Sequence, residues 1–437
     1  MVSIGETYFV DGVDYKIISD NQVAIVRLVS DYVCFVISNY VIINDDIFSV
    51  VAIEKDAFNW NHKLSSISVG SSIEKIETNF LISINNLLSI SVDDGNKEYY
   101  SVDNCIIKHG EHKLILGCAN SKIPKSVCEI GSGAFASCEL LKTIDIHNHV
   151  THIDEDAFGG CRNLVSVNLP SNLISLGAGA FLSCQSLSFI EIPSSVETIG
   201  AYAFAGCGLL KTITIPNKVN EISTELFREC SRLESVVMHP NIKRIGDYAF
   251  FGCEWLSVEI PYGVETIENC AFEQCLSLPS IVIPDSVKYI GNSAFKRCEN
   301  LEHVTLSTNI KVIRKEMFKD CFSLKSIVIP EGVTRLEENA FENCSGLKTV
   351  TIPSSITTIG EGAFNDCFRL EKIICLMEKP IDRDFFEIQE CIYQMEKVAT
   401  KTIYVRDSCV DIYKKDLYWR QFKIKPLSKI SHKKVSL

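Results

Sequence analysis

The sequence lacks the features that mark several common classes of protein. No apolar run approaches the roughly 18 residues that a transmembrane helix needs. Residues 1–11 hold no basic segment followed by an apolar run, so they are not predicted to be a secretory signal peptide. The 43 lysines and arginines are outnumbered by 55 aspartates and glutamates. The net charge of −12 argues against nucleic acid as a partner, because binding phosphates requires a basic face.

Motifs that carry chemistry are also missing. There is no Cys-x2-Cys pair, no His-Glu-x2-His and no glycine-rich phosphate loop after a strand. The strongest candidate for a metal site is His147, His149 and His152, with Asp154 and Asp156 near them in the sequence. We interpret these histidines as solvated residues, because His147 and His149 occupy turn positions that vary from repeat to repeat. We therefore predict no catalytic activity, no cofactor and no bound metal.

What the chain does contain is a repeat with a period of 23 residues. Eleven cysteines recur at this period, and nine of the ten intervals between them are 23 residues long, the other being 22. Each of these cysteines, called the ladder cysteines, has a leucine three residues after it and a phenylalanine three residues before it. Such a period is typical of a solenoid, in which equivalent positions point inward in every coil. The ladder cysteines are Cys138, Cys161, Cys184, Cys207, Cys230, Cys253, Cys275, Cys298, Cys321, Cys344 and Cys367.

The residues within one repeat predict the path of one coil. In the copy that begins at Cys161, apolar residues alternate from Leu164 to Leu169, which indicates a strand. Pro170 has no amide donor, so it ends the strand and starts a corner. A second extended piece ends at Gly177, and the Ala-Phe-x2-Cys segment then has room for a single helical turn. We expect the phenylalanines to lie in the core, and the ladder cysteines to be buried and reduced.

These repeats resemble those of a known family. The Leu-x2-Ile-x-Ile segment resembles the strand of leucine-rich repeats. The Ile-Pro, Ile-Gly and Ala-Phe-x2-Cys elements resemble the BspA-type leucine-rich repeats, which are common in bacterial surface proteins. The resemblance implies a strand-rich α/β solenoid, right-handed, with short helical turns and a β cap at each end. Counting regular and degenerate repeats predicts about 13 coils.

The segments outside the regular repeats predict how the chain is organised. The first repeat is degenerate and has Asn61 in place of a cysteine. An insertion interrupts the period before the regular repeats; we interpret it as a hairpin, with a ligand-binding flap as the alternative. We expect an N-terminal β cap (1–50), degenerate first repeats (51–91), the inserted hairpin (92–130), regular repeats (131–376), a C-terminal cap (377–427) and a disordered tail (428–437).

A candidate binding face follows from the strand positions. The residues five and seven after each ladder cysteine flank an inward apolar residue, so they should point outward from the sheet. Most are small hydroxyl or β-branched residues, which strand propensity alone explains. The row lacks the arginine and aromatic anchors typical of binding hot spots, apart from one phenylalanine. The candidate binding residues are Phe189, Glu191, Thr212, Thr214, Ser235 and Val237.

Two functions agree with these observations. The first is a surface-displayed or secreted interaction protein that binds a protein or another macromolecule of a host or neighbouring cell. The resemblance implies it, because the family includes adhesins, and the segment from Gly5 to Tyr15 resembles the start of mature BspA-type proteins. The second is an intracellular scaffold for a protein partner, with a cytoplasmic location. For both we expect a monomer without a transmembrane segment.

Overall fold

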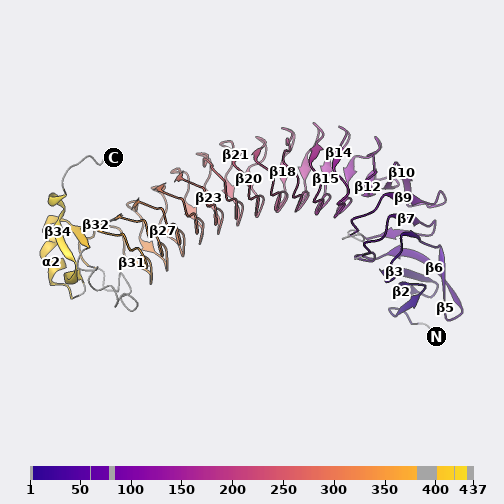
Figure 1. Cartoon of the computed structure of the whole chain (residues 1–437), viewed down its shortest axis with the longest axis horizontal. Coiled ribbons are helices and arrows are strands. Elements are labelled where there is room, and N and C mark those ends of the chain that lie inside the picture. Colours follow the sequence, from indigo (N-terminus) through magenta and orange to yellow (C-terminus); the bar gives the residue numbers. More distant parts are fainter. Residues whose placement is uncertain (1–2, 60, 78–83, 381–400, 418, 431–437) are drawn as a thin grey trace. The chain divides into compact units, whose positions relative to one another are not determined.

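The computed structural model describes residues 3–59, 61–77, 84–380, 401–417 and 419–430. The chain is a β-solenoid of about 16 turns with little helix. It divides into two compact units, Met1–Val219 and Asn220–Leu437, and each is described by itself. Within each unit, consecutive coils lie side by side (Figure 1). In the described part of the chain, no helix has the length and hydropathy that crossing a membrane requires.

The first unit begins with a six-stranded sheet in the order β1-β2-β3-β6-β5, with β8 paired to β6. Asp11 and Gly12 form the tight turn between β1 and β2, and both have positive φ angles. The inner side of this sheet packs into an apolar core that includes Phe48 and Phe58. The strands are β1 (Thr7–Val10), β2 (Val13–Ser19), β3 (Gln22–Leu28), β5 (Tyr40–Ile43), β6 (Asp46–Ile53) and β8 (Lys75–Ile76).

Parallel sheets then follow the coils of the first unit. One face of the coils carries short strands that pair in the orders β4-β7-β9 and β14-β16. A second sheet, β10-β11-β12-β13-β15-β17-β18, starts as an antiparallel hairpin and becomes parallel from β12 onward. The strands are β4 (Cys34–Val36), β7 (Ser66–Val69), β9 (Ser89–Val92), β10 (Tyr99–Val102), β11 (Cys105–Lys108), β12 (Lys113–Leu116), β13 (Glu129–Ile130), β14 (Thr143–Asp145), β15 (His152–Ile153), β16 (Ser166–Asn168), β17 (Ser175–Leu176), β18 (Thr198–Ile199) and β19 (Thr212–Thr214).

The second unit repeats this two-sheet arrangement. The longest sheet has the order β24-β26-β28-β30-β32-β33-β34, and all of its pairs are parallel. The opposite face carries β20-β22-β23-β25 and β27-β29-β31. The strands are β20 (Glu221–Ile222), β21 (Ser235–Val237), β22 (Arg244–Ile245), β23 (Thr266–Ile267), β24 (Ser280–Val282), β25 (Tyr289–Ile290), β26 (His303–Thr305), β27 (Val312–Ile313), β28 (Ser326–Val328), β29 (Arg335–Leu336), β30 (Thr349–Ile352), β31 (Thr358–Ile359), β32 (Lys372–Cys375), β33 (Thr402–Val405) and β34 (Lys423–Pro426).

The C-terminal segment extends the sheet of the second unit. Strands β33 and β34 pair in parallel beyond the last regular coil, and Tyr413 and Trp419 are buried beside them. Three short helices lie between these strands, η2 (Asp407–Cys409), α2 (Val410–Lys415) and η3 (Trp419–Gln421), and a fourth, η4 (Leu427–Lys429), follows β34. Ser428 and Lys429 therefore lie in a helical turn, whereas the sequence predicted the start of a disordered tail. Residues 431–437 lie outside the described residues.

The predicted number of coils was too low. The count of about 13 left out the segments at the two ends. There, β4 pairs in parallel with β7, and β33 and β34 continue the sheet of the regular coils. These strands extend the sheets beyond the repeats that were counted, and the chain has about 16 turns in all. The end segments diverge from the repeat in sequence because their inward positions need only be apolar, not identical.

The expected helical turn at Ala-Phe-x2-Cys is a pair of tight turns. In one coil, Gly179 and Ser183 both have positive φ angles, of 61° and 57°, which interrupt a right-handed helix. The amides of Gly179, Phe181 and Ser183 do not bond within a helix. They donate to the carbonyls of Ala201, Ala203 and Ala205 in the next coil, at 2.8, 2.8 and 2.7 Å. The corner of one coil is thus joined to the next coil by backbone hydrogen bonds, as neighbouring strands of a sheet are.

The phenylalanines that precede the ladder cysteines form stacked columns, as the sequence predicted. In the first unit, the ring centroids of Phe158 and Phe181 are 5.3 Å apart, and those of Phe181 and Phe204 are 5.7 Å apart. In the second unit, Phe295 stacks between Phe272 and Phe318 at 5.3 and 5.5 Å. The rings are within about 15° of parallel. In each unit the stacked phenylalanine rings therefore form part of the buried apolar core.

The ladder cysteines donate hydrogen bonds that join neighbouring coils. The Sγ atom of Cys161 lies 3.0 Å from the carbonyl oxygen of Phe135, which belongs to the preceding coil. Eight further ladder cysteines make the same contact, at 3.1 to 3.3 Å. In the degenerate first repeat, Asn61 takes this role and its Nδ2 atom donates to the carbonyl oxygen of Leu28 at 2.8 Å. The cysteine or asparagine at the ladder position therefore has two roles: it packs in the core and it donates a hydrogen bond to the preceding coil.

All eleven ladder cysteines are buried and none is bridged, so their thiols should react slowly. Burial raises the pKa of Cys184 to about 12, which leaves almost no thiolate at neutral pH. In a thiol titration of the native protein we expect fast reaction at Cys34 and Cys128, which are the exposed cysteines among the described residues. After denaturation without reductant, the eleven ladder thiols should react as well. Mass-spectrometric detection of disulfides between ladder cysteines would contradict this prediction.

Candidate functional site

The outward face of the first unit carries two rows of side chains at strand spacing. One row contains Thr143, Ser166 and Phe189, and the parallel row contains Asp145, Asn168 and Glu191. The register of β14 with β16 pairs Thr143 with Ser166 and Asp145 with Asn168, and an isolated bridge joins Ser166 to Phe189. The residues between the rows, such as Ile144, Val167 and Ile190, are buried.

The coil that contains Phe189 lacks the strand that its neighbours have. Ile190 and Ile192 are buried, so the alternation of side chains is kept. However, the isolated bridge at Phe189 replaces a strand, and β16 in the preceding coil has no strand partner on this side. The two coils are therefore less tightly joined at their outward face than β14 and β16 are.

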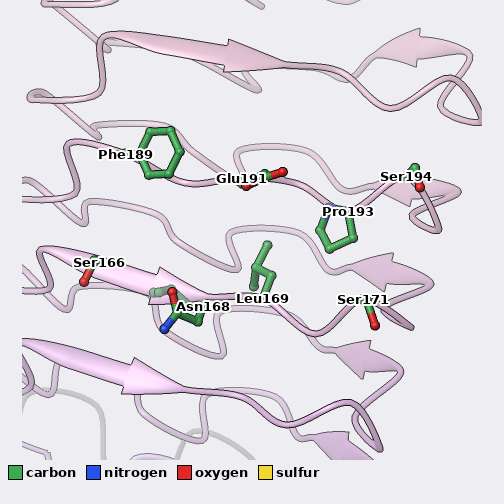
Figure 2. Close-up of a pocket in the computed structure, with 9 residues that line it drawn as sticks. Ser166, Asn168, Leu169, Ser171, Phe189, Glu191, Pro193 and Ser194 are labelled. Atoms are coloured by element: carbon green, nitrogen blue, oxygen red, sulfur yellow. The ribbon is translucent and has the colours of Figure 1, made fainter.

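A shallow hollow of about 440 Å³ lies between these two coils. Figure 2 shows Phe189, Glu191, Pro193 and Ser194 along one coil, with the lining residues of the preceding coil beside them. The Phe189 side chain is 61% exposed, which is unusual for so large an apolar ring. The remaining lining residues, on the preceding coil, are Ser166, Val167, Asn168, Leu169 and Ser171.

The charge in and beside the hollow is negative. Glu191 is exposed and makes no ion pair with any residue that the structure describes. Asn168 is held by its neighbour, because its Nδ2 atom donates to Oδ1 of Asp145 at 2.6 Å. That contact does not use the side-chain oxygen Oδ1 of Asn168, which can accept a hydrogen bond. None of the nine lining residues carries a positive charge.

The structure brings together only some of the predicted binding residues. Phe189 and Glu191 line the hollow, whereas Thr212 and Thr214 are exposed on β19 and do not line it. Ser235 and Val237 belong to β21 in the second unit; Ser235 is half-buried and Val237 is exposed. The sequence analysis did not select Ser171 and Ser194, which follow prolines at the coil corners and line the hollow. Serine is common in turns, so its presence after a proline gives no sign of a binding site.

The histidines considered for a metal site have other partners. Nε2 of His147 lies 2.8 Å from the carbonyl oxygen of Pro124, and Nδ1 of His149 lies 2.9 Å from that of Lys125. Nδ1 of His152 lies 2.9 Å from the hydroxyl oxygen of Thr151. In the part of the chain that the structure describes, no three histidine, cysteine, aspartate or glutamate side chains form a group that could hold a metal ion.

Solved structures similar to this chain are leucine-rich repeat proteins. A leucine-rich cell surface protein from Faecalibacterium prausnitzii is 27% identical, with a TM-score of 0.52 over 85% of this chain and 94% of that one. A leucine-rich repeat protein from Bacteroides ovatus is 23% identical, with a TM-score of 0.44 over 84% of this chain and 94% of that one. The pneumococcal vaccine antigen PcpA is 18% identical, with a TM-score of 0.47 over 97% of this chain and 98% of that one.

The sequence itself also matches a family model. The model is that of the BspA type leucine rich repeat region, present in six copies. No curated protein matches the chain. The matched residues are 32–109, 115–234, 153–279, 220–347 and 265–393, which together cover most of the chain. The chain therefore belongs to the BspA-type leucine-rich repeat family.

Proposed function

We propose that this leucine-rich repeat protein is a non-enzymatic interaction protein, displayed on a cell surface or secreted, that binds a macromolecule of a host or neighbouring cell. The membership of the BspA-type family supports an interaction role. The similarity to a cell surface protein at 27% identity over 85% of the chain supports the location. An intracellular scaffold is the alternative, and locating the protein in intact and lysed cells with an antibody would separate the two.

The observation that carries the proposal is the hollow beside Phe189. An aromatic ring that is 61% exposed has no packing role in its own coil, because Ile190 and Ile192 fill the inward positions there. Aromatic side chains in hollows are the usual anchors of protein interfaces. The sheet around the ring presents threonine and serine hydroxyls, which form hydrogen bonds without carrying a strong charge. This combination fits a binding face better than a catalytic one.

Substituting the anchor residue should weaken binding without weakening the fold. We expect Phe189→Ser to reduce binding to an immobilised panel of extracellular-matrix proteins by about tenfold or more, the loss that is common at a hot spot. Denaturant melts should change little, since the side chain is mostly exposed. Phe368→Ser is a matched control, because Phe368 is 49% exposed and belongs to the second unit.

Other outcomes would place the binding face elsewhere. If deletion of residues 92–130 abolishes binding and Phe189→Ser does not, the insertion and not the sheet face is the binding site. If both variants bind the panel as well as the wild type does, or if the wild type binds no matrix protein, the proposed function is wrong.

A further inference from the structure

We propose that the hollow between Ser166 and Phe189 binds the cationic side chain of a lysine or arginine in an extended segment of a partner protein. The inference rests on the proposed function and specifies the chemistry of the partner at the same face. Three independent features support it: an unpaired carboxylate, an exposed aromatic ring and an open stretch of sheet.

The carboxylates of Glu191 and Asp145 have no cationic partner among the described residues. Across much of the surface, carboxylates are paired with lysine or arginine, as Glu197 is with Lys218 and Glu265 is with Lys288. Glu191 differs, because it has no ion pair with any described residue and no lining residue is cationic. In the same row, the Asp145 carboxylate accepts a hydrogen bond from the neutral side-chain amide of Asn168 and makes no ion pair within the described part of the chain. A partner cation would form the charge-assisted hydrogen bonds that these groups lack.

The aromatic ring is in the right place for the same cation. Phe189 and Glu191 are two residues apart in an extended segment, so both side chains point to the same face, about 7 Å apart along the chain. An ammonium or guanidinium group over the ring face is attracted by its quadrupole. The structure shows this contact elsewhere, with the guanidinium carbon of Arg314 4.5 Å from the ring centroid of Tyr289.

The shape of the hollow favours a long side chain of an extended segment over a compact ligand. At about 440 Å³ it is at the small end of the range for ligand sites, and its lining residues follow two neighbouring coils. Leu169 and Pro193 offer apolar area for the methylene groups of a lysine or arginine stem. The hydroxyls of Ser166, Ser171 and Ser194 border the hollow and could bond the partner's backbone.

The second unit contains a natural comparison for the test. Its coil of 22 residues has Ser257, Val258 and Glu259 where the proposed site has Phe189, Ile190 and Glu191. Glu259 is exposed, and its coil also lacks a strand at these residues. The two places therefore share an exposed glutamate beside an irregular coil, but the second has Ser257 at the position of the Phe189 ring, and its exposed aromatic residues, Trp255 and Tyr262, occupy other positions. Glu259→Gln is the matched control for Glu191→Gln.

The test measures binding of the full-length chain to an immobilised Gly-Arg-Gly-Arg-Gly peptide by surface plasmon resonance. The comparison peptide contains citrulline, which has nearly the shape of arginine but no charge. We expect binding to the arginine peptide at least about fivefold tighter than to the citrulline peptide, and weaker in high salt. Glu191→Gln should reduce it about tenfold and Phe189→Leu about threefold, while Phe189→Tyr and Glu259→Gln leave it unchanged.

Several results would overturn the inference. Equal binding of the citrulline peptide would show that charge is not recognised, and equal losses in Glu191→Gln and Glu259→Gln would show a non-specific surface effect. Binding of a neutral disaccharide in place of the arginine peptide would assign the hollow to a saccharide. If neither peptide binds but Phe189→Ser still abolishes matrix-protein binding, the cationic ligand is wrong and the proposed function stands. If matrix-protein binding is also absent, both are wrong.

Discussion

Raising the pH from 9 to about 10.5 is expected to unfold the chain, and the ladder cysteines are the reason. Burial raises the pKa of Cys138, Cys184 and Cys367 to about 12, from an ordinary value of about 9. Six more ladder thiols have a pKa raised by the same cause. In eight of these nine groups, all but Cys138, a hydrogen bond to a phenylalanine carbonyl also favours the protonated form, because only the thiol can donate.

The sign of the effect follows from which state holds the protons. Between pH 9 and 12 the folded chain keeps its buried thiols protonated, whereas the unfolded chain loses those protons. Rising pH therefore favours unfolding. The stabilisation of the folded state by the protonated thiols is fully present only below about pH 9. One thiol changes the free energy of unfolding by about 1.4 kcal/mol per pH unit in this window. Nine such groups give a slope on the order of 10 kcal/mol per pH unit, comparable to the whole stability of a typical domain.

Urea melts from pH 7 to pH 10.5, followed by circular dichroism, would measure this slope. The double variant Cys298→Ser and Cys321→Ser keeps a hydrogen-bond donor at both positions but removes two titrating groups. Its slope above pH 9 should be smaller by about a fifth. Thiolate absorbance at 240 nm should rise together with unfolding in both proteins. A stability that stays constant up to pH 10, or thiolate that forms in the folded chain, would show that the thiols are not buried as described.

Phe295→Ala is expected to destabilise the second unit by about 3–5 kcal/mol, the usual cost of truncating a buried phenylalanine. The ring is fully buried and stacks on Phe272 and Phe318, so the alanine leaves a cavity with an aromatic wall on each side. Neighbouring coils cannot collapse into this space, because their backbones are held apart at strand spacing. The loss should therefore lie near the upper end of the range.

Denaturant melts of Phe295→Ala, Phe295→Leu and Phe322→Ala would test this prediction. Phe295→Leu should lose less, since leucine refills much of the cavity. Phe322 follows a ladder cysteine but is 38% exposed, so its truncation should change the free energy of unfolding by less than about 1 kcal/mol. Similar losses in Phe295→Ala and Phe322→Ala would contradict a stacked aromatic core.

The parts of the fold that the sequence predicted are those that every coil repeats. The same positions point inward in each coil, so the period alone indicated that they are buried. Examples are Phe158, Cys161 and Leu164. The helical turn was wrongly predicted because the Ala-Phe-x2-Cys pattern does not reveal the left-handed residues in this corner, such as Ser183 within the segment and Gly179 just before it. The additional turns at β4, β33 and β34 were missed because they retain the strand but not the repeat.

The candidate site was predictable only in part. The spacing from the ladder cysteine indicated that Phe189 and Glu191 point outward, and an exposed aromatic ring stands out among serines and threonines. The hollow itself depends on a strand that is absent from one coil, and the alternation of apolar residues between Leu187 and Pro193 is the same as in the coils that have the strand. The pairing of Asn168 with Asp145 joins two repeats, so no pattern within one repeat predicts it.

The last described strand of the second unit has an edge that disfavours pairing with a further strand. A parallel sheet can grow at its edge, and an exposed edge strand invites another chain to pair with it. In the described residues, β34 is the last strand of its sheet and reads Lys423, Ile424, Lys425, Pro426. Proline has no amide to offer an incoming strand, and two lysines would be brought against any copy of the same edge. These residues therefore disfavour pairing of this edge with another copy of the same strand.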